Sequence, residues 1–175
     1  ILAAGAVPVV IGGDHSVNIP CINAFDGQEP FHLVQIDAHL DFVDERHGVR
    51  YGHGNPMRRA AEKPYVTGLS QVGIRNVSST ARDGYEDARA MGSDIVSVRQ
   101  FRKMGVDAML DRIPEGARYY VTIDIDGFDP SIAAGTGTPS HGGFLYCEVL
   151  EVLDGLTRRG DIVGVDLVEV APDYD

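Results

Sequence analysis

Residues 34–41 read Val34-Gln35-Ile36-Asp37-Ala38-His39-Leu40-Asp41, an apolar run that ends in three side chains able to bind a metal. In an extended strand alternate side chains point to the same face, so we expect Asp37, His39 and Asp41 to project to one side. Three ionisable groups beside an apolar run are costly to bury unless something neutralises them. A divalent cation is the simplest neutraliser, so this stretch predicts a metal site at the end of a buried strand.

Strand-like and helix-like segments alternate along the whole chain. Short apolar runs predict strands at residues 6–11, 31–36, 70–74, 119–123 and 162–168. The segments between them predict helices at residues 16–25, 79–91, 99–113 and 145–159, and a loop at residues 42–59. This alternation is typical of an α/β fold, which we expect to form three layers around a mainly parallel sheet.

The length and composition set limits on the kind of protein. The 175 residues suit a single domain, and because the chain opens on Ile1 we interpret residues 1–175 as an internal fragment that lacks the N- and C-terminal portions. The formal net charge of −11 argues against a nucleic-acid partner and favours a cationic substrate. No apolar stretch approaches the roughly 20 residues that span a bilayer. With only Cys21 and Cys147, the default expectation is a reducing, cytoplasmic setting.

Polar side chains follow four of the predicted strands. They are His15; Asp37, His39 and Asp41; Asp124 and Asp126; and Glu169. In α/β sheets, sites gather outside the carboxyl ends of the strands, so these groups predict one shared site. Two divalent cations would balance the charge of four aspartates, and carboxylates that bridge them would hold the ions roughly 3.5–4 Å apart. A mixed set of oxygen and imidazole ligands favours Mn²⁺ over Mg²⁺ or Zn²⁺.

Two further residues are candidates for catalysis and substrate binding. A metal pair makes hydroxide available near neutral pH, and its attack on a trigonal carbon requires that the leaving group be protonated. His53, in the glycine-flanked stretch Tyr51–Pro56, suits that role better than His47, which precedes it by six residues. Glu169 has no evident metal role, and its free carboxylate suits a guanidinium group.

Four motifs together resemble the ureohydrolases, the arginase and agmatinase group, across essentially the whole chain. They are Gly12–Ser16, Asp37–Asp41, Asp124–Pro130 continuing to Gly137–Pro139, and Glu169–Pro172. The resemblance implies an arginase-like fold, a single ureohydrolase domain, two Mn²⁺ per subunit and a trimer or hexamer. It also implies a small cationic guanidino substrate, with urea and an amine as products.

The resemblance also assigns roles to individual residues. One Mn²⁺ would be bound by His15, Asp37, Asp41 and Asp124, and the other by His39, Asp37, Asp124 and Asp126, so that Asp37 and Asp124 bridge the pair. A hydroxide that bridges the ions would attack the substrate. His53 would shuttle the proton, and Glu169 would bind the guanidinium group.

Residues next to the motifs indicate which guanidino compound is the substrate. Val43 stands where arginases carry an asparagine that contacts the amino-acid head group, and residues 51–59 resemble the agmatinase version of the histidine loop. We therefore expect hydrolysis of agmatine to putrescine and urea. Arg46 and Arg50 in the same loop allow a guanidino acid such as guanidinobutyrate as an alternative substrate, and arginine is a further alternative. Two other hypotheses remain: a single-zinc hydrolase related to the deacetylases, and a non-catalytic ureohydrolase-like subunit.

Overall fold

A six-stranded parallel sheet forms the middle layer of the computed structural model, which describes all 175 residues. The strands are β1 (Val9–Ile11), β2 (Phe31–Ile36), β3 (Val66–Val72), β4 (Ser93–Val96), β5 (Arg118–Asp124) and β6 (Asp161–Val168). Their order is β1-β6-β5-β2-β3-β4, and every pairing is parallel. The carboxyl ends of all six strands therefore lie along one edge. The predicted α/β fold with a mainly parallel sheet is confirmed.

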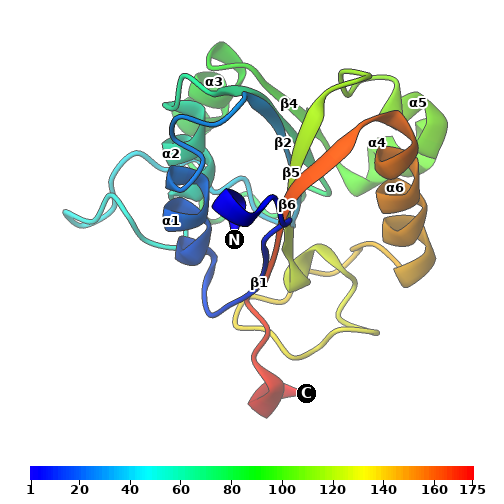
Figure 1. Cartoon of the computed structure of the whole chain (residues 1–175). Helices are drawn as coiled ribbons and strands as arrows, with labels where there is room; N and C mark the ends of the chain where they lie inside the picture. The colour runs from blue at the N-terminus through cyan, green and yellow to red at the C-terminus, as the bar shows by residue number, and fades with distance from the viewer.

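Helices cover both faces of this sheet (Figure 1). One side carries α1 (Asn18–Asn23), α2 (Pro56–Ala61) and α3 (Arg82–Ala90), and the other carries α4 (Val98–Met104), α5 (Val106–Leu110) and α6 (Tyr146–Arg159). Four short 3-10 turns complete the chain: η1 (Leu2–Ala4), η2 (His15–Val17), η3 (Ile125–Gly127) and η4 (Pro172–Tyr174). None of the helices is both long and apolar enough to cross a membrane.

Strand β2 lies between the two halves of the core and is buried at all six positions. Phe31 and Leu33 pack with the helices on one face, whereas Val34 and Ile36 pack in the cluster on the other. A strand buried on both faces is expected to be almost continuously apolar, which is the pattern that made β2 recognisable in the sequence. Its last residue, Ile36, directly precedes Asp37, so the core fixes where the predicted metal-binding segment begins.

Several element boundaries differ from the sequence-based expectation. Helix α2 begins within residues 42–59, which were predicted as a loop, and extends to Ala61; it starts at Pro56, whose fixed φ suits the first turn of a helix. Strand β4 was not predicted, because its four residues at the edge of the sheet contain no apolar run. The helix predicted at residues 99–113 is two helices, since Gly105 has a φ of 84° and ends α4.

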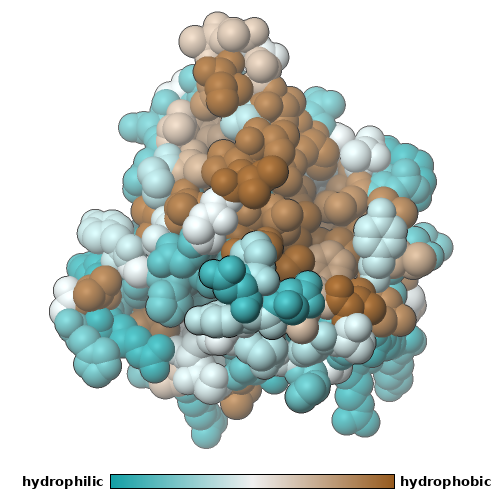
Figure 2. Space-filling view, turned by 90° about the horizontal axis from the view of Figure 1, so that it is seen from below, coloured by the Kyte–Doolittle hydropathy of each residue, from teal (hydrophilic) through white to brown (hydrophobic).

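The outer strand β1, at the side of the sheet opposite β4, exposes apolar side chains. Strand β1 pairs with β6 only, and Val9 and Ile11 on it are 68% and 79% exposed. Figure 2 shows a broad apolar area beside a polar one on the face seen from below. An area of this kind is typical of a surface that other protein elements cover.

Glycine lets two loops at the carboxyl edge approach each other closely. Gly73, just after β3, has a φ of 105°, and a Cβ there would lie 2.7 Å from the carbonyl oxygen of Asp37. Gly127 lies against the backbone of Asp37 as well, because a Cβ there would lie 3.0 Å from the backbone nitrogen of Asp37. The backbone at Asp37 is therefore held between two glycines.

We predict that Gly73→Ala destabilises the protein through this contact and through a second one, because the added Cβ would also lie 2.8 Å from the ring of Phe144. Both Gly73 and Gly92 have positive φ, but a Cβ at Gly92 would meet no atom within 4 Å, so Gly92→Ala is a matched control for backbone strain alone. The added clash should make Gly73→Ala about 1–3 kcal/mol less stable than Gly92→Ala in urea unfolding. Equal stability of the two variants would show that the close contacts at Gly73, with Asp37 and with Phe144, do not matter.

Candidate metal centre

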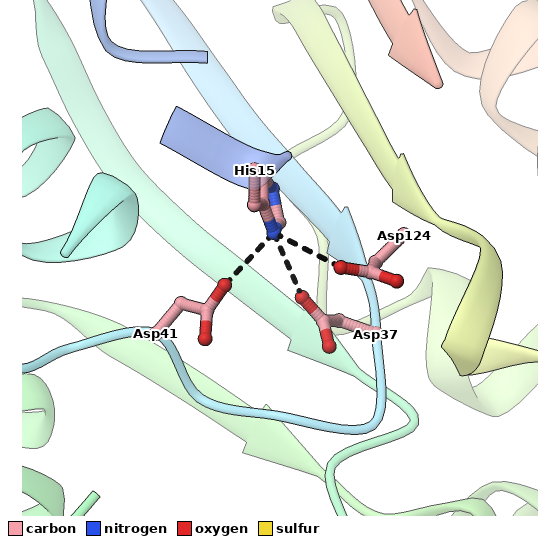
Figure 3. A group of neighbouring side chains, drawn as sticks. All are labelled: His15, Asp37, Asp41 and Asp124. Carbon is pink, nitrogen blue, oxygen red and sulfur yellow. Dashed lines mark ion pairs between the residues drawn. The ribbon is translucent and has the colours of Figure 1, made fainter. Parts of the chain in front are cut away.

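Three buried aspartate side chains lie around one ring nitrogen of His15, which is itself buried (Figure 3). Its Nδ1 lies 2.8 Å from an oxygen of Asp41, 3.2 Å from one of Asp37 and 3.4 Å from one of Asp124. His15 begins η2 shortly after β1, Asp37 and Asp41 follow β2, and Asp124 ends β5. The parallel sheet thus brings together residues that lie as much as 109 positions apart in the sequence.

A second group shares one member with the first. Nδ1 of His39 lies 3.0 Å from an oxygen of Asp126 and 3.7 Å from one of Asp37, and the three residues form a buried set. Asp37 is common to the two groups, as a bridging ligand would be. Asp124 belongs only to the first group in this geometry, although the family resemblance implies that it bridges as well.

The segment from Asp37 to Asp41 does not have the extended shape that we expected. Strand β2 ends at Ile36, and Asp37 Oδ1 accepts a hydrogen bond of 2.6 Å from the backbone nitrogen of His39. Asp41 has a φ of 52°, in the left-handed region. The prediction that strand alternation places the three side chains on one face is therefore wrong. A turn brings the three side chains to the site and places His39 in the second group.

The pKa values reflect four carboxylates crowded into a buried space. Burial disfavours charge on His15, but its contacts with Asp124, Asp37 and Asp41 outweigh this and raise its pKa well above the usual value. Burial likewise opposes charge on His39, yet Asp126 and Asp37 raise its pKa to about 10. Burial and the neighbouring Asp37 raise the pKa of Asp41 to about 6. The cluster therefore requires added positive charge, either from protons or from cations.

The donor geometry fits a cation. Nδ1 of His15 is fully buried and makes no well-oriented hydrogen bond, although three carboxylate oxygens lie within 3.4 Å of it. Ligands that each lie about 2.1 Å from a common ion, at right angles to one another, are about 3 Å apart. These separations are those of a coordination shell, so the residues fit a divalent ion at each group.

A cavity of about 360 Å³ opens onto both groups. Its walls include His39, Asp41, Asp124 and Asp126 from the two groups, together with His53, Glu169, Arg46, Ser78, Ser79 and Thr138. His47 borders only an adjoining cavity, which it shares with Val43 and His53. A larger apolar cavity of about 500 Å³ around Pro8 and Pro20 contains no part of the cluster. The residues singled out in the sequence thus share one polar cavity, with His15 and Asp37 buried beneath it.

Glu169 also connects β6 to the first group. Its Oε1 accepts a hydrogen bond of 2.7 Å from the backbone nitrogen of His15, and its own nitrogen donates to Gly13. The residue has a φ of 62°, which is uncommon outside glycine and is found at sites where the surroundings impose it. One carboxylate oxygen therefore holds His15, and the side chain borders the cavity.

Sequence reasoning missed several polar residues that hold the ligand candidates in place. Gln35 donates to Asp37 over 2.6 Å, Thr138 donates to Asp126 over 2.9 Å, and Arg75 donates to the carbonyl oxygen of Asp126 over 2.7 Å. Gln35 had a visible signal, because it is a polar residue inside the apolar run of β2. Thr138 lies in the quoted motif Gly137–Pro139, but no role was assigned to it, and Arg75 lies in a loop and had no signal.

We predict that Asp126→Ala removes one metal ion from the full-length protein without unfolding it, because Asp126 belongs only to the second group. Metal analysis after dialysis should give about one divalent metal ion fewer per chain. Asp161→Ala is the control, because Asp161 is exposed and lies at the amino end of β6, away from the carboxyl ends of the strands. This variant should retain the full metal content. Unchanged metal content in Asp126→Ala would contradict this arrangement.

Comparison with known proteins gives the same family over the entire chain. The family model described as "Arginase family" matches residues 1–175. The chain is 39% identical to guanidinopropionase of Pseudomonas aeruginosa and 36% identical to mitochondrial agmatinase of Gallus gallus, covering 99% and 100% of this chain. The structure of proclavaminate amidino hydrolase from Streptomyces clavuligerus superposes with a TM-score of 0.84 at 36% identity, over 95% of this chain and 56% of that one. The chain spans 56% and 53% of the two curated relatives, about half their length. On sequence and fold together, the chain belongs to the arginase family.

Proposed function

We propose that the protein is a Mn²⁺-dependent amidinohydrolase that releases urea from a small guanidino compound. The observation that carries this proposal is the pair of His/Asp groups that share Asp37 and open onto a cavity bordered by His53 and Glu169. Membership of the arginase family supports the reaction class. A purely structural role would not need so many ionisable groups buried around one cavity.

The two groups suit manganese because each joins one imidazole to carboxylate oxygens, with no thiolate. When bound, a pair of divalent ions supplies an ionised water as nucleophile near neutral pH. The chain's own part is to orient the substrate and to supply a proton. Overall, one water oxygen would become bonded to the guanidino carbon and the bond from that carbon to the substituted nitrogen would break; both protons of the water would end on that nitrogen, which gives urea and a protonated amine.

Two residues would carry those tasks. The carboxylate of Glu169 would accept hydrogen bonds from the guanidinium group and fix its orientation. His53 would give its proton to the departing amine, and an imidazole is suited to such a transfer at neutral pH. The position of His53 beside the cluster's cavity supports it over His47, which borders only the adjoining cavity.

Agmatine is the first substrate that we propose. Val43 offers no polar contact to an amino-acid head group, and Glu169, the carboxylate of the cavity that belongs to neither metal group, favours a cation. A second candidate is a guanidino acid, and one observation favours it. Arg46 borders the same cavity, where its guanidinium would attract a carboxylate at the far end of the substrate. The similarity to a guanidinopropionase is consistent with this candidate.

A urea assay of the full-length protein separates these possibilities. With added Mn²⁺ we expect urea from agmatine at a higher kcat/KM than from 4-guanidinobutyrate, 3-guanidinopropionate or arginine, and loss of activity after chelation. Equal or faster turnover of a guanidino acid would replace agmatine but keep the reaction class. Absence of urea from all four compounds, with a single zinc ion per chain or with two bound Mn²⁺, would instead support the deacetylase-like or the non-catalytic hypothesis.

The proposed acid–base residue has a matched control in its own loop. His53→Asn should lower kcat by about 10²–10⁴-fold while leaving metal content unchanged, because proton transfer by a positioned side chain contributes about that much. His47→Asn, in the same exposed loop, should retain nearly full activity. If His47→Asn is the impaired variant instead, the two roles are reversed.

A further inference from the structure

A chain of buried polar groups continues behind His15, on the side away from the cavity. Nε2 of His15 lies 2.9 Å from Oγ1 of Thr122, and the Thr122 hydroxyl donates a short hydrogen bond to Asp166. Thr122 in β5 and Asp166 in β6 are directly opposite each other in the sheet, and both are fully buried. Nothing in the proposed reaction uses either residue.

Asp166 acts as an acceptor at both of its oxygens. Oδ1 takes the hydroxyl of Thr122, while Oδ2 accepts from the amide of Asn18 over 2.8 Å and from the hydroxyl of Tyr120 over 2.7 Å. An amide nitrogen can only donate, which fixes the direction of the hydrogen bond from Asn18. Three donors thus converge on one buried carboxylate.

This arrangement determines which nitrogen of His15 carries a proton. A threonine hydroxyl has one hydrogen, and it is committed to Asp166, so Oγ1 can only accept from the His15 ring. Nε2 must therefore be the protonated nitrogen. In the neutral ring, Nδ1 then presents its lone pair to the oxygens of Asp37, Asp41 and Asp124, and a cation between them makes the contact favourable.

We propose that Thr122 and Asp166 are positioning residues that fix the tautomer of His15 and thereby set the affinity of the first metal group. The proposal rests on the proposed metal pair. It concerns the first group alone, because His39 in the second group has no contact with Thr122 or Asp166. Loss of the hydrogen bonds from Thr122 and Asp166 should therefore weaken the binding of one ion and leave the binding of the other unchanged.

Replacement of Thr122 tests the proposal by metal binding. Thr122→Val keeps the shape and removes the hydroxyl, so Mn²⁺ titration of the full-length protein, followed by the electron paramagnetic resonance signal of free Mn²⁺, should show one of the two sites weakened about 10–100-fold. Thr122→Ser restores the hydroxyl and should bring affinity to within about threefold of the wild type.

A control comes from a similar pair elsewhere in the same sheet. Nε2 of His32 lies 2.9 Å from the hydroxyl of Ser70, and both residues are buried on β2 and β3. Ser70→Ala removes a hydroxyl–histidine hydrogen bond of equal length that is not part of either metal group. It should leave both Mn²⁺ affinities unchanged, which separates a general loss of buried hydrogen bonding from the effect on His15.

Asp166→Asn provides a second variant in case Thr122→Val does not fold. With Asn18 and Tyr120 kept as donors, the amide oxygen of the new side chain faces these two residues and its NH₂ group faces Thr122. The hydroxyl of Thr122 then points to Nε2 of His15 and favours the wrong tautomer. We expect the same site to be weakened at least as much as in Thr122→Val, although the side-chain volume is conserved.

The outcomes are distinguishable from failure of the proposed function. Two wild-type affinities in Thr122→Val or Asp166→Asn would overturn the role of the polar chain while leaving the metal pair in place. Thr122→Ser as weak as Thr122→Val would also overturn it, because packing and not the hydroxyl would then be responsible. A wild-type protein that binds fewer than two Mn²⁺ would contradict the proposed function itself.

Discussion

The arrangement depends on the repulsion among four aspartates that are buried within a few ångströms of one another. Asp37, Asp41, Asp124 and Asp126 have almost no access to solvent, and burial alone opposes charge on each of them. The contacts with His15 and His39 offset only part of that cost. A protein retains such a cluster where a ligand supplies the missing positive charge. The fold at the carboxyl edge of the sheet can be understood as the means of holding these groups together.

The parallel sheet provides this framework through a few close contacts. The β2, β5 and β6 strands deliver their terminal residues to one edge, and glycines at positions 73 and 127 let neighbouring loops touch the backbone of Asp37. Polar side chains beneath the edge, among them Gln35, then orient the carboxylates. The position of each ligand candidate is therefore set by core packing and by hydrogen bonds.

The sequence was sufficient for the fold class and for the members of the cluster, because apolar runs followed by Asp and His are strong local signals. It failed where the cause is not local. The turn at Asp37 depends on a hydrogen bond to His39, and Asp41 adopts a positive φ that strand periodicity does not anticipate. The pairing of Asp166 with Thr122 appears only when β5 and β6 lie side by side.

The most direct test of the central claim is anomalous diffraction at the manganese absorption edge from crystals of the full-length protein grown with Mn²⁺. Two anomalous peaks should appear roughly 3.5–4 Å apart. One should contact Nδ1 of His15 and the other Nδ1 of His39, with the Asp37 carboxylate contacting both. A single peak, or a second peak away from His39 and Asp126, would contradict the account.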